Sequence, residues 1–204
     1  MSMTDTLPAG FNDTTLDSQR AFRTALDALS RPGRIVTMPD LLPDGAPAPL
    51  MPATAALALA LFDYETPVWL DGAADTPAVR DWLRFHCGCP LVADRAQARF
   101  ALLAGAPGSP GTMAGFDTGT DAYPDRSATL IWQVGSLSEG SAYRLAGPGI
   151  AQEESLKTNS LYAGFDSDWQ KNAKLFPRGL DLFLVAGDRL AGLPRTVTIM
   201  RVEG

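Results

Sequence analysis

The most apolar run of the chain, residues 53–62, constrains the fold more than any other segment. It is rich in alanine and leucine, which favour helix, and it is apolar on all sides. With about ten residues it has roughly half of the ~20 that a helix needs to cross a bilayer. We therefore predict a central helix that is buried on every face inside a protein core.

The length and composition of the chain allow one such core. Its 204 residues, 46% hydrophobic and 20% charged, lie in the range of globular domains, which excludes a disordered or collagen-like chain. We predict a single α/β domain over residues 1–204, with residues 1–13 flexible. These first residues carry neither a basic stretch nor an apolar segment, so no secretory signal is visible and we expect a cytoplasmic protein without membrane contact.

The charge balance argues against nucleic acid as a partner. The 17 Lys and Arg residues oppose 23 Asp and Glu residues, which gives a net charge of −6 and a pI near 4.7. An acidic protein has no general attraction to a phosphate backbone. Three of the basic residues are lysines and the rest are arginines, whose planar guanidinium suits bidentate contacts with phosphate and carboxylate.

Local patterns predict alternating helices and strands. The first helix follows Thr14, with Asp17 placed as the acid of a capping box, and Pro32 and Gly33 stop it. Helices are predicted at residues 15–30, 53–62, 77–85 and 166–176, and strands at residues 34–38, 67–70, 100–103, 128–134, 143–145, 182–185 and 196–202. The pattern indicates an α/β fold with a mixed sheet flanked by helices.

His86 is the only histidine, and its imidazole could serve as an acid or a base near neutral pH. A catalytic triad would have to be built around it, but no Gly-x-Ser-x-Gly turn accompanies it. It lies at the end of a predicted aromatic-rich helix, where an imidazole can cap the last carbonyl groups. A structural role is the main interpretation, and a substrate contact is the alternative.

Cys87 and Cys89 follow His86, and the three side chains could ligate a soft metal ion. Three donors on one strained turn rarely converge on one ion, and two thiols are too few for a closed zinc site. The two cysteines are also too close in the sequence for an easy disulfide. We therefore predict reduced, buried thiols and no bound metal.

Two further segments could bind an anion. Glycines recur through residues 105–115 as in a phosphate-binding loop, but no Gly-Lys-Ser/Thr sequence follows, so a mobile loop is the main interpretation. Arg126 lies among Asp121, Asp125 and Ser127 just before an apolar strand. Its guanidinium could bind phosphate at the strand end or form an ordinary ion pair.

A pyridoxal phosphate enzyme needs a lysine for its Schiff base. Lys157, Lys171 and Lys174 are the only lysines, and two of them lie on a polar helical face. Each is interpreted as a surface residue, so no pyridoxal phosphate is expected.

Five short segments, spread over about residues 15 to 200, carry a family resemblance. They contain Ala21-Phe22-Arg23 with Leu29-Ser30-Arg31-Pro32-Gly33; Asp63-Tyr64-Glu65-Thr66-Pro67-Val68-Trp69-Leu70; Leu83-Arg84-Phe85-His86 with Pro90-Leu91-Val92; Gly119-Thr120, Pro124, residues 127–131, Gln133-Val134 and residues 145–150; and Phe176-Pro177, Gly179-Leu180-Asp181-Leu182 and Leu193-Pro194-Arg195-Thr196. Together they resemble the PhnH family of the bacterial carbon-phosphorus lyase system. Their constant order is more specific than any single motif.

The resemblance implies a fold similar to that of the pyridoxal-phosphate-dependent transferases, without the cofactor lysine. It implies an accessory subunit that is needed with PhnG, PhnI and PhnL to transfer the ribose triphosphate moiety of ATP to an alkylphosphonate. It also implies a core complex with PhnG, PhnI and PhnJ, of which PhnJ is the iron–sulfur radical subunit, and this chain lacks the cysteines for that role. The resemblance assigns no catalytic residues, so His86, Arg126 and Arg195 are candidates for substrate contact.

Other classes of function stay open. Tight binding of a nucleotide or a phosphonate by the purified chain would favour a free-standing binding protein, and turnover lost in His86→Ala would favour an independent transferase or hydrolase. The apolar strands at residues 182–185 and 196–200 would leave sheet edges to cover, which predicts a homodimer for the isolated chain.

Overall fold

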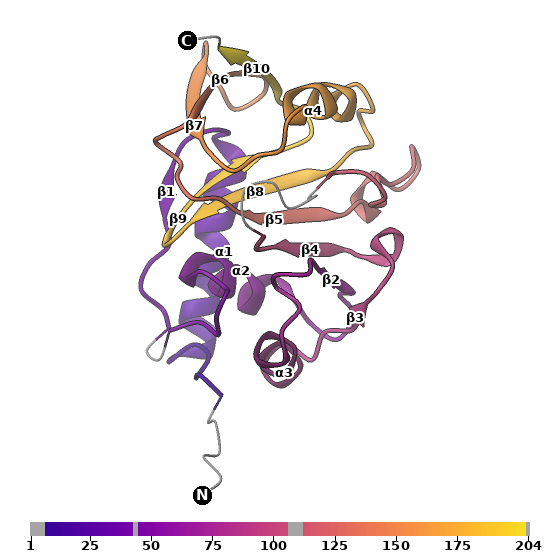
Figure 1. Cartoon of the computed structure of the whole chain (residues 1–204). Helices are drawn as coiled ribbons and strands as arrows, with labels where there is room; N and C mark the ends of the chain where they lie inside the picture. Colours follow the sequence, from indigo (N-terminus) through magenta and orange to yellow (C-terminus); the bar gives the residue numbers. More distant parts are fainter. Residues whose placement is uncertain (1–6, 43–44, 106–111, 203–204) are drawn as a thin grey trace, which may run out of the picture.

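A computed structural model describes residues 7–42, 45–105 and 112–202 of the chain (Figure 1). The helices are α1 (Thr14–Ser30), α2 (Pro52–Leu61), α3 (Pro77–His86) and α4 (Phe165–Ala173), with short 3-10 turns η1 (Arg95–Gln97) and η2 (Pro124–Arg126). None of these helices has the length and hydropathy of a membrane span. The strands form two sheets, whereas the sequence predicted one.

The large sheet has seven strands and is mixed, as predicted. Its strand order is β1 (Val36–Thr37), β9 (Arg189–Leu193), β8 (Asp181–Ala186), β5 (Thr129–Gln133), β4 (Phe100–Leu103), β2 (Val68–Leu70), β3 (Leu91–Val92). The five strands from β8 to β3 are parallel, and β9 runs antiparallel to both of its neighbours. The small sheet is antiparallel, in the order β10 (Thr198–Val202), β6 (Ser141–Ala146), β7 (Glu154–Thr158).

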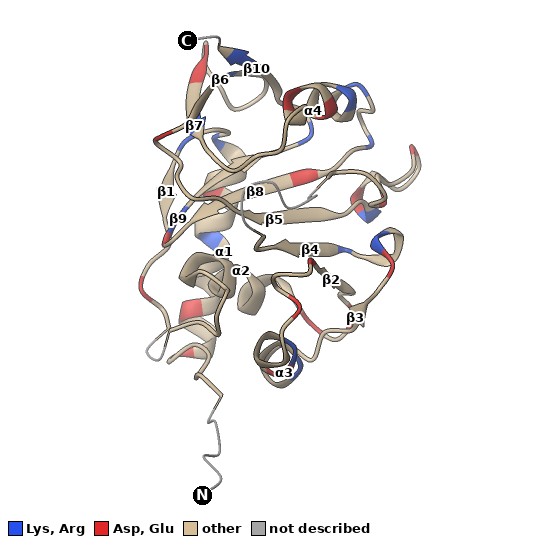
Figure 2. Ribbon diagram, viewed as in Figure 1, with Lys and Arg blue, Asp and Glu red and all other residues tan. Residues whose placement is uncertain are grey.

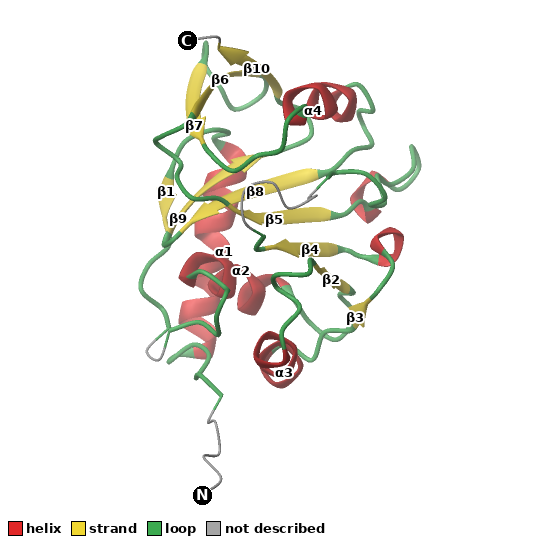
Figure 3. Ribbon diagram, viewed as in Figure 1, coloured by secondary structure: helices red, strands yellow, loops and turns green. Residues whose placement is uncertain are grey.

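The large sheet is buried on both faces, which makes a layered fold (Figure 3). Leu102, Ile131 and Phe183 belong to the core that contains α1, α2 and α3. Their neighbours along the strands, such as Leu130 and Leu184, belong to a second core with α4 and the small sheet. A parallel sheet covered on both faces needs continuous apolar strands, and this is why the central strands were predicted correctly from the sequence.

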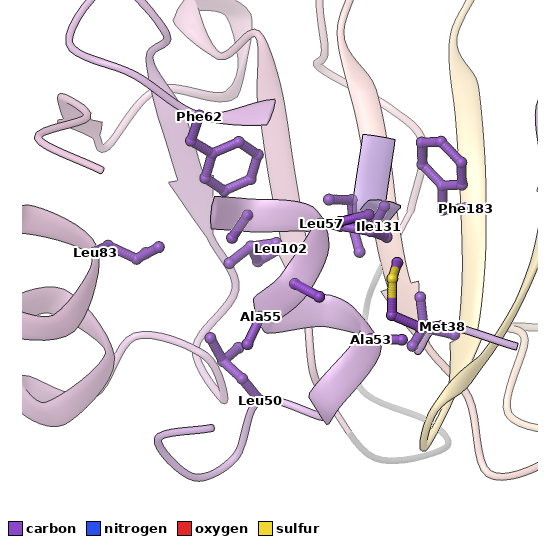
Figure 4. Close-up of a cluster of buried hydrophobic side chains, with 14 of the residues drawn as sticks. Met38, Leu50, Ala53, Ala55, Leu57, Phe62, Leu83, Leu102, Ile131 and Phe183 are labelled. Carbon is purple, nitrogen blue, oxygen red and sulfur yellow. The ribbon is translucent and has the colours of Figure 1, made fainter. Parts of the chain in front are cut away.

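Helix α2 is the central helix that the apolar run predicted. Six consecutive positions, residues 53–58, are buried, so all of its faces meet protein along this stretch. Leu57 lies between the sheet residues Leu102 and Ile131 in the packed core (Figure 4). A fully buried leucine contributes about 1.5–3 kcal/mol relative to an exposed one.

Side-chain caps mark the starts of α1 and α3. Asp13 Oδ1 accepts hydrogen bonds from the backbone of Thr15 and Leu16, and the Asp13 N–H donates to Asp17 Oδ2 over 3.0 Å. Asp17 accepts a hydrogen bond from the cap residue, as predicted, but that residue is Asp13 and not Thr14, and the helix begins one residue earlier than predicted. Thr76 caps α3, because its Oγ1 accepts a hydrogen bond from the Val79 N–H over 3.2 Å.

The strand predictions needed four corrections. Strand β1 has two residues instead of the predicted 34–38, and β3, β7 and β9 were not predicted. The edge argument for a homodimer was wrong for residues 182–185, because β8 lies inside the sheet between β5 and β9. At the C-terminal strand, Trp169 Nε1 donates to Val197 O and Gln170 Nε2 donates to Ile199 O, so α4 covers backbone carbonyls beside and within β10.

Candidate functional site at the amino ends of the parallel strands

The topology gathers polar residues from distant parts of the chain at one end of the large sheet, where its parallel strands begin. Ser127 precedes β5 and Asp181 begins β8, so both lie at the amino ends of parallel strands. Strand β9 runs in the opposite direction, so Arg195, which follows it, lies at the same end of the sheet. Figure 2 shows basic and acidic segments side by side around η1 and η2, at this end of the sheet.

Arg195 lies at the centre of this group of polar residues, which we call the Arg195 cluster. Its backbone N–H and its Nε both donate to Asp181 Oδ1, over 2.8 and 3.1 Å, and Nη2 pairs with Asp181 Oδ2. Its Nη1 donates to Pro124 O over 2.8 Å and to Pro177 O over 3.4 Å, and Nη2 donates to Ser127 Oγ over 2.6 Å. Each guanidinium nitrogen therefore has a partner. The Arg195 side chain is only 14% exposed and joins η2, β8 and the loop before β8.

Arg126 lies on η2, the turn that Arg195 contacts, but its side chain faces solvent. Its guanidinium carbon is 4.2 Å from the centroid of the Tyr123 ring, and Tyr123 is itself 52% exposed. Among the residues that the structure describes, no carboxylate forms an ion pair with Arg126, whereas Arg178 pairs with Asp121 over 3.2 Å. The Arg126 guanidinium thus keeps donors that an incoming anion can use.

His86 lies elsewhere, at the end of α3. Its Nε2 is 3.0 Å from Pro8 O, and Trp82 Nε1 donates to the same oxygen over 3.0 Å. The imidazole packs against the rings of Trp82 and Phe85, with centroids 5.0 and 4.9 Å away. His86 therefore holds the segment before α1, part of the stretch that was expected to be flexible, and its partner is Pro8 instead of the helix-end carbonyls. None of its contacts belongs to the Arg195 cluster.

The carboxyl ends of the parallel strands carry polar residues that sequence reasoning missed. Asp71 follows β2, is 7% exposed, and accepts hydrogen bonds from the backbone of Ala74 and Gly105 over 2.7 and 2.8 Å. Gln133 ends β5, accepts from the Met51 N–H over 2.6 Å, and donates to Pro49 O. The sequence signal that could have identified them is an amide or carboxylate side chain at the end of an apolar strand, because a buried polar group needs hydrogen-bond partners. Both side chains are used to fix loops.

The other predicted groups have simple surroundings. Cys87 and Cys89 are free thiols, and among the described residues no three His, Cys, Asp or Glu side chains gather as metal ligands. The three lysines are exposed. Gly108 and Gly111 of the glycine-rich loop lie outside the described residues, so its role stays a prediction.

Sequence comparison places the chain in a family. The model of the family described as bacterial phosphonate metabolism protein (PhnH) matches residues 9–200. The chain is 36% identical over 191 residues to alpha-D-ribose 1-methylphosphonate 5-triphosphate synthase subunit PhnH of Rhizobium meliloti (strain 1021), covering 94% of each chain. It is 33% identical over 184 residues to putative C-P lyase subunit protein HtxG of Stutzerimonas stutzeri, covering 89% of this chain and 85% of the relative. The chain therefore belongs to the PhnH family of bacterial phosphonate metabolism proteins.

Proposed function

We propose that the chain is an accessory subunit of the carbon-phosphorus lyase system in organic phosphonate catabolism. The observation that carries the proposal is the end-to-end match, over 94% of both chains, to a relative named as a synthase subunit. The step in which it takes part is the transfer of the ribose triphosphate moiety of ATP to an alkylphosphonate. A second relative, named as a putative C-P lyase subunit, supports the same pathway.

The finer proposals concern partners and fold. We propose PhnG, PhnI and PhnL as the proteins needed with this chain for the transfer, and PhnG, PhnI and PhnJ as its core complex in the cytoplasm. The isolated chain is proposed to form a homodimer, through a surface other than the interior strand β8. The large mixed sheet with helices packed on it supports the proposed likeness to pyridoxal-phosphate-dependent transferases.

The contacts divide the three candidate residues by role. Arg126 is exposed and keeps free donors, which supports a direct contact with a phosphate or phosphonate group. Arg195 has all its guanidinium nitrogens engaged, which supports a positioning role that fixes η2 and with it Arg126. His86 is bonded to Pro8 O, which supports a structural role in holding the N-terminal segment.

Deletion of the gene is expected to abolish growth on methylphosphonate and to leave growth on inorganic phosphate unchanged. The wild-type gene should restore growth. The Arg126→Met variant should restore it only in part, because an uncharged side chain cannot bind the anion. Arg189→Met, at an exposed arginine on β9, is the matched control. Normal growth of the deletion strain on methylphosphonate would contradict the pathway.

Biochemical assays separate a subunit from an independent enzyme. The pure chain with ATP and methylphosphonate is expected to release no adenine, and release should begin when the partner subunits are added. Adenine release by the chain alone would contradict the accessory role. Tight binding of ATP or methylphosphonate without any dependence on partners would favour the free-standing binding protein.

The purified chain is expected to form no internal aldimine with pyridoxal phosphate. Lys157 lies on the exposed side of β7, and Lys171 and Lys174 are exposed at the end of α4, so none has the enclosed setting that a Schiff-base lysine needs. The measurement is borohydride reduction followed by peptide mass mapping. A stoichiometric adduct on one lysine would show that this expectation is wrong.

A further inference from the structure

Two turns of the same kind lie beside the end of α1, and none of the roles above uses them. Arg31-Pro32-Gly33-Arg34 is closed by a hydrogen bond from the Arg34 N–H to Arg31 O over 3.1 Å, and Gly33 has a φ of +80°. Gly147-Pro148-Gly149-Ile150 is closed by a bond from the Ile150 N–H to Gly147 O over 3.2 Å, and Gly149 has a φ of +86°. Proline in the second position and glycine in the third are typical of a type II turn.

Close contacts at the two glycines pack these turns against each other. A Cβ at Gly149 would overlap Ser30 O and would lie 2.8 Å from Pro32 Cδ. A Cβ at Gly33 would lie 3.1 Å from Glu154 Cγ, so the Glu154 side chain lies directly against the first turn. The two turns and the Glu154 side chain therefore form one packed unit.

A cavity opens between the turns. Its volume is about 430 Å³, and its lining comes from Arg31, Pro32 and Arg34 on one side and from residues 149–154 on the other. Pockets for small ligands usually have about 300–1,000 Å³. Arg31 and Arg34 are the first and last residues of one turn, whose Cα atoms lie less than about 7 Å apart, so the two arginines flank the cavity at neighbouring positions.

Two ion pairs neutralise part of the charge around the cavity. They are Arg31 with Asp27 and Arg144 with Glu153. Among the residues that the structure describes, the exposed Arg34 guanidinium has no hydrogen bond or ion pair, and the Glu154 carboxylate accepts only the N–H of its neighbour Ser155, over 3.2 Å. One cation and one carboxylate in the same cavity thus remain for a ligand.

The two free charges select the chemistry of that ligand. A guanidinium binds phosphate through paired hydrogen bonds. A carboxylate repels phosphate but accepts hydrogen bonds from hydroxyl groups, as an acidic residue does from ribose in dinucleotide-binding folds. A polyphosphate chain would meet the charge of Glu154, whereas a molecule with one anionic group and several hydroxyl groups matches both side chains.

We propose that this cavity binds a phosphorylated sugar, with its phosphate on Arg34 and its hydroxyl groups on Glu154. Arg31 adds donors to the phosphate, because its pair with Asp27 uses only part of its guanidinium. The cavity lies between the end of α1 and the loop from β6 to β7, whereas Arg126 lies on η2. The proposal does not rest on the proposed pathway, so growth on methylphosphonate and sugar phosphate binding can fail separately.

The test is titration of the isotope-labelled full chain with ribose 5-phosphate, with inorganic phosphate and with ribose, followed by NMR near neutral pH. Ribose 5-phosphate is expected to bind weakly but saturably, with shift changes at residues 31–34 and 147–154. Inorganic phosphate should bind about tenfold more weakly, because it lacks the hydroxyl groups that Glu154 accepts, and ribose should not saturate. The proposal would be overturned if ribose 5-phosphate gave no saturable shifts, or if inorganic phosphate bound equally well.

Variants assign the two contacts. Arg34→Met should weaken binding of ribose 5-phosphate about tenfold or more, because it removes hydrogen bonds between charged groups. Glu154→Met should weaken binding of ribose 5-phosphate and strengthen binding of inorganic phosphate, because it removes the hydroxyl acceptor and the repelling charge together. Arg201→Met, at an exposed arginine on β10, should change neither.

Circular dichroism shows that each variant is folded. Unchanged binding of ribose 5-phosphate by folded Arg34→Met would overturn the proposed phosphate contact. Stronger binding of both ligands by folded Glu154→Met would also overturn the proposal, because it would mean that the cavity only attracts anions.

Discussion

Replacement of Arg195 by methionine is expected to lower the free energy of unfolding by about 3–5 kcal/mol, because it leaves Asp181 as a largely buried charge without its partner. The Asp181 side chain is 21% exposed, and the variant also removes the donors to Pro124 O and Ser127 Oγ. In a chain of this size, each kcal/mol lowers Tm by about 2–4 °C. Urea unfolding followed by circular dichroism measures the loss.

Two control variants show whether the planar set of hydrogen bonds stabilises the protein or only the charge does. Arg195→Lys keeps the charge but not the planar set of donors, so its loss should lie between those of wild type and Arg195→Met. Arg201→Met removes an exposed arginine that donates, among the described residues, to Ser141 Oγ, and its effect should stay within about 0.5 kcal/mol. A loss below about 1 kcal/mol for Arg195→Met would refute the central role given to this residue.

The second large effect is expected from Gly192→Ala, a change of one methyl group. A Cβ at Gly192 would lie 2.6 Å from Ala28 O and 2.8 Å from Leu29 N, which are backbone atoms of α1. Backbone cannot turn away as a side chain can, so α1 must move off strand β9. Overpacking of this kind costs about 1–3 kcal/mol, or more where the helix cannot shift.

Gly72→Ala is the matched control for this prediction. Gly72 is exposed, its φ is not in the left-handed region, and a Cβ there would meet no atom within 4 Å. Thermal unfolding of the two variants beside wild type gives the comparison. Equal Tm values for Gly192→Ala and Gly72→Ala would show that α1 does not approach β9 as closely as described.

Much of the fold follows from continuous apolar segments. Residues 100–103 and 182–185 are apolar without interruption, and residues 53–62 are apolar except for Thr54, because each segment is packed inside the protein. All three became central elements at the predicted places. Strand β7 was missed because only Leu156 and Thr158 of its five residues are buried. A polar strand of that length has no pattern that separates it from a loop.

Strand β9 was missed for a different reason. Gly192 interrupts it, and glycine inside a strand usually argues against one, since it contributes no side chain to the packing. Here the missing side chain is what lets α1 lie directly on the strand. The requirement comes from a helix about 160 residues earlier in the chain, so no local pattern could reveal it.

Local sequence patterns could not predict the candidate site either. Arg195 binds residues that lie 14, 18, 68 and 71 positions away, and only the strand order brings them together. Single motifs around Arg126 or Arg195 could not predict that cluster. The family resemblance singled out the right segments because they contact one another: Arg195 joins its fourth and fifth segments, and a Cβ at Gly149 would overlap Ser30 O, where the first segment meets the fourth.

The bond from Trp82 to Pro8 defines where the folding unit starts. The indole of Trp82 is fully buried, and its N–H donates to a carbonyl that precedes the first helix by several residues. A shortened chain that begins at Thr14 would keep every helix and strand and still leave a buried donor without an acceptor, at a cost of about 1–3 kcal/mol. A boundary for expression drawn at the first secondary-structure element would therefore cut into the folded domain.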